Sequence, residues 1–313
     1  MKEYGFGADL GGTTCKLGVF RTDGELLDKW EIPTDTSNNG ENILKDISDS
    51  IHSKMIEMDL TKDMVQGIGI GVPGAVTPDG IVNRCVNLGW GVIEIEKDLG
   101  ELSGLKVKAA NDANIAALGE SWVGSGRGSD SLVMVTLGTG IGGGVVVNGK
   151  ILVGHNGAAG EIGHINVNED ELEECGCGNH GCIEQYASAT GIVRVAKRRL
   201  AQTQRDSKLR EIENFSAKDV FDLAKENDEL AEEIVKEIGM LLGKMIAKVA
   251  NVLNPEVILI GGGVSKAGDI IIEELQDGFY SQVFHASRET KIKLASLGND
   301  AGIYGGMRLI LED

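Results

Sequence analysis

The sequence predicts an α/β protein with two domains, and three observations lead to this prediction. The chain has 313 residues, which is more than one hydrophobic core usually covers. Apolar runs typical of strands are separated by stretches with the apolar spacing of helices. Two strand pairs have similar glycine turns, one at Asp9-Leu-Gly-Gly-Thr and one at Thr136-Leu-Gly-Thr-Gly. This weak internal duplication predicts two similar domains, each offering a phosphate-binding hairpin to a cleft between them.

Composition and charge narrow the possible partners. The formal net charge of −18 argues against nucleic acid or an anionic membrane surface, but not against a nucleotide held by backbone N–H groups and a metal ion. No charged-then-apolar leader opens the chain, and no apolar run approaches the ~20 residues of a membrane helix. We therefore expect a cytoplasmic protein.

The first glycine turn joins two expected strands, Tyr4 to Ala8 and Cys15 to Phe20. Its backbone could close on a phosphate while threonine hydroxyls donate to the phosphate oxygens, Asp9 could hold Mg²⁺ through water, and Lys16 could reach a phosphate. An ordinary glycine hairpin explains the turn equally well. The candidate nucleotide residues here are Asp9, Gly11, Gly12, Thr13, Thr14 and Lys16.

An amphipathic helix around residues 43–55 and a strand at Val65 to Val72 follow. Gly69, Gly71 and Gly74 match the dinucleotide-binding pattern literally, but a loop with Pro78 stands where that motif needs a helix. The polar segment from Asn83 to Gly91 could supply the Asn87 amide and the Trp90 ring to a small polar ligand. A plain surface loop explains this segment equally well.

A strand beginning at Val107 ends at Asn111 and Asp112, where a helix begins. A carboxylate at the carboxyl end of such a strand lies where open α/β sheets bind ligands, beside the positive end of a helix. Asp112 is therefore a candidate general base. The alternative is that Asn111 or Asp112 only caps the helix.

The second glycine turn, with Thr136, Gly138, Thr139 and Gly140, again joins two strands rather than opening a helix. Three cysteines follow in Cys175-Gly-Cys177-Gly-Asn-His180-Gly-Cys182, close behind Gly160-Glu161-Ile-Gly-His164. Three thiolates and one imidazole complete a tetrahedral Zn²⁺ site with no open position, so we expect a structural zinc ion. His164 and His180 compete for the fourth position.

The rest of the chain predicts helices at residues 187–200, 219–225 and 229–253, with a polar linker from 202 to 215. A buried strand from Val257 runs into Gly261, Gly262 and Gly263, which we expect to open a helix and to lie flat beside a nucleoside. A last strand at Lys291 to Leu297 leads into a final helix that should pack on the first domain.

The motifs together resemble those of a known superfamily. Asp9-Leu-Gly-Gly-Thr-Thr, Thr136-Leu-Gly-Thr-Gly and Ile260-Gly-Gly-Gly-Val-Ser resemble the two phosphate motifs and the adenosine motif of actin-like ATPases, which have a ribonuclease H-like fold. The cysteine cluster with Glu184, behind Glu161 and His164, resembles the signature of the ROK family of repressors and sugar kinases. Val86-Asn87-Leu-Gly-Trp90, residues 110–120 and residues 187–193 are most similar to ROK glucokinases of Gram-positive bacteria.

The resemblance implies a two-domain actin-like ATPase fold, with the active site in the cleft between a small domain at 1–113 plus 299–313 and a large domain at 114–298 that carries the zinc loop. It implies a glucokinase that uses Mg-ATP at the 6-hydroxyl of D-glucose, the first step of glucose use in glycolysis, and a homodimer or homotetramer. Asp112 would be the general base. Zinc would be bound by His164, Cys175, Cys177 and Cys182. The sugar would be bound by Gly74, Asn87, Asn111, Asp112, Glu161, His164 and Glu184.

Two other functions compete with this expectation. Family members that repress transcription carry a DNA-binding segment ahead of the kinase-like fold, whereas here the first phosphate hairpin begins at Asp9 and the chain is acidic. An inactive sugar sensor would be expected to lack Asp112 or a phosphate turn. The same reaction on N-acetylmannosamine, fructose or allose, or with polyphosphate or ADP as donor, is the closer rival.

Overall fold

The computed structural model describes residues 2–312 and divides the chain into two compact units. The first unit comprises Met1–Asp130, Gly144–Gly160 and Leu297–Asp313, and the second comprises Ser131–Gly143 and Glu161–Ser296. The boundaries expected from the sequence, after residues 113 and 298, stay a prediction. Contacts instead assign helix α3 (Asp112–Trp122) to the first unit, because it packs along α9 (Ala301–Leu311).

The first unit is built on a five-stranded sheet with the order β3-β2-β1-β4-β7. Strands β1, β2 and β3 are antiparallel to one another, whereas β4 and β7 run parallel to β1. The chain places these strands at Tyr4–Leu10, Thr14–Arg21, Leu26–Pro33, Val65–Val72 and Val107–Asn111.

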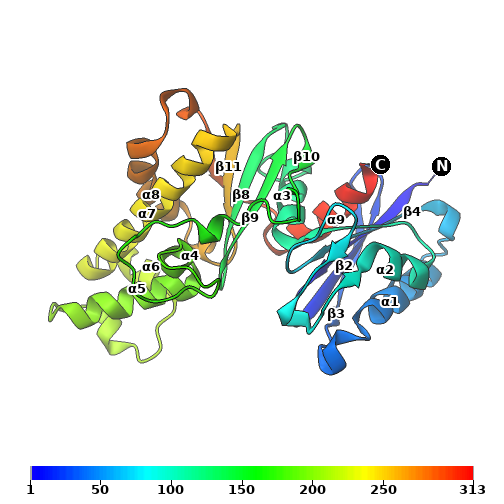
Figure 1. The fold of residues 1–313 in the computed structure, drawn as a ribbon, viewed down its shortest axis with the longest axis horizontal. Helices are drawn as coiled ribbons and strands as arrows, with labels where there is room; N and C mark the ends of the chain where they lie inside the picture. The colour runs from blue at the N-terminus through cyan, green and yellow to red at the C-terminus, as the bar shows by residue number, and fades with distance from the viewer. Residues whose placement is uncertain (1, 313) are drawn as a thin grey trace. The chain divides into compact units, whose positions relative to one another are not determined.

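Alternation along β1 separates the two faces of this sheet. Phe6, Ala8 and Leu10 point into a buried core with residues of α1 (Ile43–Glu57) and α2 (Ile95–Ser103). Figure 1 shows these two helices beside the sheet. Gly7 lies on the opposite face, where an added Cβ would be 1.9 Å from the Ile303 carbonyl oxygen of α9. Asp9 shares the α9 face, at the carboxyl end of the strand.

The second sheet repeats the plan of the first. Its order is β10-β9-β8-β11-β12. The strands β8, β9 and β10 thus take the places that β1, β2 and β3 have in the first sheet, and β11 and β12 take those of β4 and β7. Both later strands are again parallel, β11 to β8 and β12 to β11. This repetition confirms the internal duplication that the two glycine turns predict. The strands lie at Leu132–Leu137, Ile141–Val147, Lys150–Ile151, Val257–Gly261 and Lys291–Leu294.

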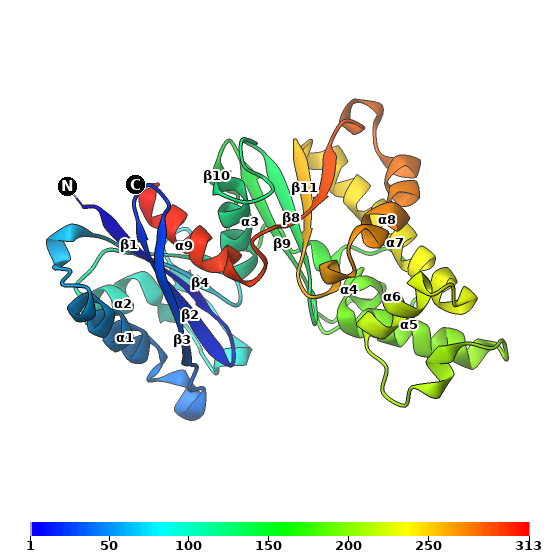
Figure 2. The same cartoon turned by 180° about the vertical axis from the view of Figure 1, so that it is seen from behind.

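The second unit contains the longest helix, α7 (Glu229–Leu253), which packs closely against α8 (Asp269–Gln282), as Figure 2 shows. Gly243 allows this approach, because an added Cβ would lie 2.0 Å from the Leu275 carbonyl oxygen. The shorter helices of this unit are α4 (Glu184–Ala187), α5 (Ala189–Gln202) and α6 (Ala217–Lys225). Within residues 2–312, the structure contains no helix long and apolar enough to cross a membrane.

The structure corrects the expected elements in three places. Strand β3 and helix α2 were not expected, and β3 lacks an apolar signal because it is an edge strand with mostly exposed or half-buried side chains. After Gly263 only a 3-10 turn forms, and α8 begins later at Asp269.

Short β5 and β6 (Ile81–Val82, Ile93–Glu94) pair within the loop after β4. The chain also forms 3-10 turns at Val86–Leu88 (η3), Ile162–His164 (η4) and Val264–Ala267 (η6).

Candidate functional site

The first glycine hairpin lies between paired strands, with Asp9 opposite Lys16 and Leu10 opposite Cys15. The Gly11 N–H donates to the Thr14 carbonyl at 3.0 Å, which closes the turn. Gly12, Thr13 and Thr14 are exposed, so their N–H and hydroxyl groups are available to a ligand. Lys16 donates to the Asn299 carbonyl at 3.2 Å, which holds its ammonium beside the turn before α9.

Asp9 has an unusual environment for a carboxylate. Its pKa is raised to about 6, first by burial and then by the charge of Asp112, while the Lys16 ammonium acts in the opposite direction. The first turn of α9 lies directly against it, because an added Cβ on Gly302 would be 2.4 Å from the Asp9 Cγ. Two carboxylates that raise each other's energy form a site that a divalent cation would stabilise.

The Asn111-Asp112 pair lies where β7 becomes α3. The side-chain oxygen Oδ1 of Asn111 caps the helix by accepting from the backbone N–H of Ala113 at 3.0 Å and of Asn114 at 3.3 Å. Its amide nitrogen donates to the Gly74 carbonyl at 3.0 Å. Asp112 is exposed, and one of its carboxylate oxygens also accepts from Ala113 N–H, at 2.8 Å. Capping therefore fixes Asn111, and the exposed Asp112 carboxylate lies beside it at the helix start.

The loop after β4 brings Asn87 beside the first hairpin. An added Cβ on Gly12 would be 3.8 Å from the Asn87 carbonyl oxygen and 3.9 Å from its Cβ. Asn87 is exposed on η3. The expectation that Trp90 forms an aromatic wall is wrong, because this ring is 4% exposed within the core and its indole N–H donates to the Gly40 carbonyl at 3.1 Å.

In the second unit, the second glycine hairpin is tied to Glu184. The Ile141 N–H donates to a Glu184 carboxylate oxygen at 2.8 Å. An added Cβ on Gly140 would be 2.4 Å from the same oxygen, so only glycine leaves room for this contact. The start of α5 holds the hairpin from the other direction, since Thr190 donates through its hydroxyl to the Thr139 carbonyl at 2.8 Å.

The third glycine turn lies next to this hairpin. Thr136 of β8 pairs with Gly261 of β11, and Gly262 has a φ of +83°. An added Cβ on Gly262 would meet the backbone of Leu137 at 2.5 Å. Beside Gly263 lies a largely apolar cavity of about 290 Å³, whose lining includes Ala189, Ala217, Phe221, Val264 and Ala267. Its walls suit a planar apolar group such as a nucleobase.

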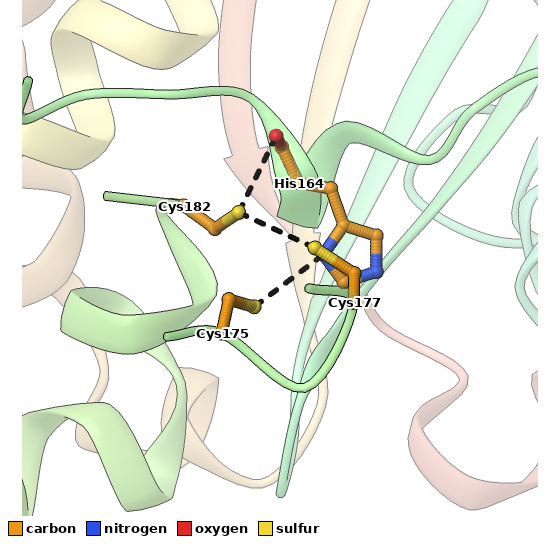
Figure 3. Close-up of side chains that lie close together, drawn as sticks. All are labelled: His164, Cys175, Cys177 and Cys182. Carbon is orange, nitrogen blue, oxygen red and sulfur yellow. Dashed lines mark hydrogen bonds between the residues drawn. The ribbon is translucent and has the colours of Figure 1, made fainter. Parts of the chain in front are cut away.

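Figure 3 shows the candidate metal centre of the second unit. One ligand atom from each of His164, Cys175, Cys177 and Cys182 lies within 4.8 Å of the others. His180 is exposed on the same loop and is not part of this group among the described residues. The imidazole faces the thiols through Nδ1, which is 3.8 Å from the Cys175 sulfur.

The donor set fits a tetrahedral zinc ion. Zn–S bonds of about 2.3 Å in a tetrahedron place two sulfurs about 3.8 Å apart, and the Cys177 and Cys182 sulfurs are 3.7 Å apart. Without a cation, burial and then the neighbouring thiols Cys177 and Cys175 raise the pKa of Cys182 to about 12. A dication would reverse this effect, because thiolates are its ligands.

The structure thus gathers the candidates into one group in each unit. Asp9, the first hairpin, Asn87, Gly74, Asn111 and Asp112 lie together in the first unit. The second hairpin, the turn at Gly261 and Glu184 lie together in the second, and His164 joins the cysteines there. The sequence reasoning missed Gly302 and Thr190, because each acts through a contact with a residue far away in the chain.

Comparisons with known proteins agree with this arrangement. A family model described as the ROK family matches residues 5–313. The chain is 43% identical over 311 residues to a glucokinase of Halalkalibacterium halodurans, covering 98% of this chain and 94% of that protein. A glucokinase of Thermotoga maritima is 36% identical over 312 residues, covering 98% and 96% of the two chains. A solved ROK family glucokinase from Streptomyces griseus, in complex with glucose and AMPPNP, has a TM-score of 0.77 at 31% identity and covers 98% of each chain.

Proposed function

The chain belongs to the ROK family, and from this membership we propose that it is a glucokinase that transfers a phosphoryl group from Mg-ATP to the 6-hydroxyl of D-glucose. The observation that carries the proposal is the 43% identity, over nearly the whole chain, to a protein named glucokinase. The geometry within each unit supports it, because an exposed carboxylate lies at a helix start in the first, and in the second one histidine and three cysteines are grouped as a metal ion would need them.

Asp112 would act as the general base. Phosphoryl transfer requires a positioned hydroxyl, a group that takes its proton and neutralisation of the phosphate charge, with little covalent work by the protein. The hydrogen bond from the Ala113 N–H holds the Asp112 carboxylate in place, and this carboxylate would take the proton. Asn111 would orient the neighbouring sugar hydroxyls, because helix capping and a hydrogen bond to the Gly74 carbonyl fix its side chain.

The two glycine hairpins would hold the nucleotide phosphates. Gly11, Gly12, Thr13 and Thr14 would donate N–H and hydroxyl groups from the first, Lys16 would neutralise charge, and Thr136, Gly138, Thr139 and Gly140 would serve the second. Asp9 would hold Mg²⁺ through water, and the bound ion would neutralise charge on the phosphate oxygens. The adenine of ATP would enter the apolar cavity beside Gly263, and Gly261 and Gly262 would lie against the ribose.

Asn87, Glu161, His164 and Glu184 would bind further sugar hydroxyls. The ring geometry supports two roles for His164, because Nδ1 faces the thiols and leaves Nε2 for a hydroxyl. Zinc would then fix the loop that presents these residues rather than take part in the reaction. Discrimination against an epimer would come from buried polar groups left unpaired, worth on the order of 1–3 kcal/mol each.

The test is the initial rate of ADP release from Mg-ATP with glucose, mannose, fructose, N-acetylglucosamine, N-acetylmannosamine and allose in turn. We expect the highest kcat/KM with glucose. A higher value with another hexose would replace the proposed substrate and keep the reaction. Inactivity with every sugar, together with no sugar phosphate formed when polyphosphate or ADP is the donor, would refute a kinase and favour a sugar sensor.

We also infer a cytoplasmic homodimer or homotetramer that starts glucose use in glycolysis. Family membership and the reaction support this inference, since ATP and glucose 6-phosphate are cytoplasmic metabolites. Light scattering of the purified chain tests the assembly, and a monomer at micromolar concentration would contradict it.

A further inference from the structure

Glu171 is a buried carboxylate in the irregular segment between His164 and Cys175. Its side chain is 2% exposed, whereas the neighbouring Leu172 is 90% exposed. Carboxylates are almost never buried to this extent without partners that compensate for the lost hydration. The proposed sugar, nucleotide and zinc ligands do not include Glu171, so its burial needs a separate explanation.

Four groups donate hydrogen bonds to this carboxylate. The guanidinium of Arg198 forks onto both oxygens at 2.7 and 2.8 Å, and that of Arg194 donates to one of them. The Tyr186 hydroxyl donates at 2.6 Å and the Glu173 backbone N–H at 3.0 Å. The hydrogen bonds from Arg198 are the largest cause that holds the pKa of Glu171 well below its usual range.

The three side-chain donors come from the helices that follow the zinc loop. Arg194 and Arg198 lie one turn apart on α5, and Tyr186 lies on α4, two residues after Glu184. The carboxylate therefore joins the segment that begins at His164 to the short helix that carries Glu184. Two further hydrogen bonds join the same segment to α4. Asn168 donates to the Tyr186 hydroxyl at 2.9 Å, and the Gln185 side chain donates to the Glu173 carbonyl at 2.9 Å.

We propose that Glu171 is a positioning residue for sugar binding, because its buried contacts with Tyr186, Arg194 and Arg198 fix Glu184 relative to His164. This inference rests on the proposed glucokinase function. Glu184 is held at only one carboxylate oxygen by the Ile141 N–H, so the orientation of α4 decides where the other oxygen points. Asp112 and the first hairpin belong to the other unit and have no part in these contacts. Loss of the carboxylate should thus weaken sugar binding and leave the chemical step unchanged.

The experiment compares Glu171→Gln with Glu173→Gln. Both carboxylates contact the same two arginines, but the Glu173 side chain is 60% exposed and its tie to Gln185 uses the backbone. For Glu171→Gln we expect the KM for glucose to rise about 10–100-fold, the range for groups that orient the ligands of a site. The kcat and the zinc content should stay at wild-type values. Glu173→Gln should match the wild type in the KM for glucose, the kcat and the zinc content.

Tyr186→Phe provides a second route if Glu171→Gln does not fold, because it removes only the hydroxyl that links α4 to the carboxylate. It should also raise the KM for glucose without changing kcat. A fall in melting temperature with unchanged KM in both variants would show a purely structural role and refute the proposal. Loss of zinc together with loss of affinity would also refute it, by assigning Glu171 to metal retention. Inactivity of the wild type with every hexose would instead refute the proposed function.

Discussion

Replacement of Gly302 by alanine tests how closely Asp9 must be placed. The new Cβ would lie 2.4 Å from the Asp9 Cγ, whereas ordinary contact begins at 3.4 Å, so one of the two groups must move by about 1 Å. Asp9 is packed beneath the first turn of α9 and has little space to yield. A displacement of 1 Å in a group that positions phosphoryl transfer costs about 100-fold in rate. We therefore expect kcat with Mg-ATP and glucose to fall about 100-fold.

Gly306→Ala is the matched control, because its Cβ would also clash at 2.4 Å, but with the Gly69 carbonyl oxygen rather than with Asp9. Both variants should lose about 1–3 kcal/mol of stability by overpacking, which thermal unfolding measures. Only Gly302→Ala should lose most of its kcat. The reasoning is refuted if Gly302→Ala keeps kcat within about tenfold of the wild type, or if the control loses as much activity at equal stability.

Three further predictions follow from the two units. Asp112→Asn should lower kcat by about 10²–10⁴-fold, the usual contribution of a general base, while zinc content and melting temperature stay unchanged; near-normal turnover would remove Asp112 from that role. Cys177→Ser should release the metal, lower the melting temperature and raise the KM for glucose, and metal analysis that finds no zinc in the wild type would contradict the site. Because folding raises the pKa of Asp9 from 3.8 to about 6, its favourable contribution to folding is present below pH 3.8 and is lost as the pH rises through about 6. Asp9→Asn without Mg²⁺ should therefore stabilise the protein at pH 8 but not at pH 4, and an equal change in melting temperature at both values would contradict this.

Local patterns in the sequence were sufficient for much of the fold. The helical spacing of Ile43, Ile47, Ile51 and Met55 predicts α1, and the two similar glycine turns predict two similar domains, whose sheets have matching strand orders in the structure. The family match and the ROK structures confirm the actin-like ATPase fold. Strand β3 could not be found in this way, because an edge strand has no buried face to produce an apolar period.

The candidate site was predictable where its chemistry is encoded by neighbouring residues. The cysteine spacing is an example, and the structure selects His164 rather than His180 as the imidazole of the group. Contacts between distant residues had no such signal. Gly302 contacts Asp9, and Glu171 contacts Arg198, only in the folded chain. Neither pair forms a local motif that the sequence could reveal. Trp90 was misplaced for the same reason, since the partner of its indole, Gly40, is fifty residues earlier.

The position of α9 in the chain has a consequence for synthesis. The sheet of the first unit has its strands within the first 111 residues, yet the helix that covers its glycine-rich face is residues 301–311. At about 5–20 residues per second, the ribosome needs roughly ten to forty seconds to make the chain between these points. During that interval Gly5, Gly7 and Gly69 face solvent without their helix, and the second unit is completed first. The first part of the protein to be made is therefore the last to finish folding, which makes nascent chains most vulnerable to proteases in their N-terminal third.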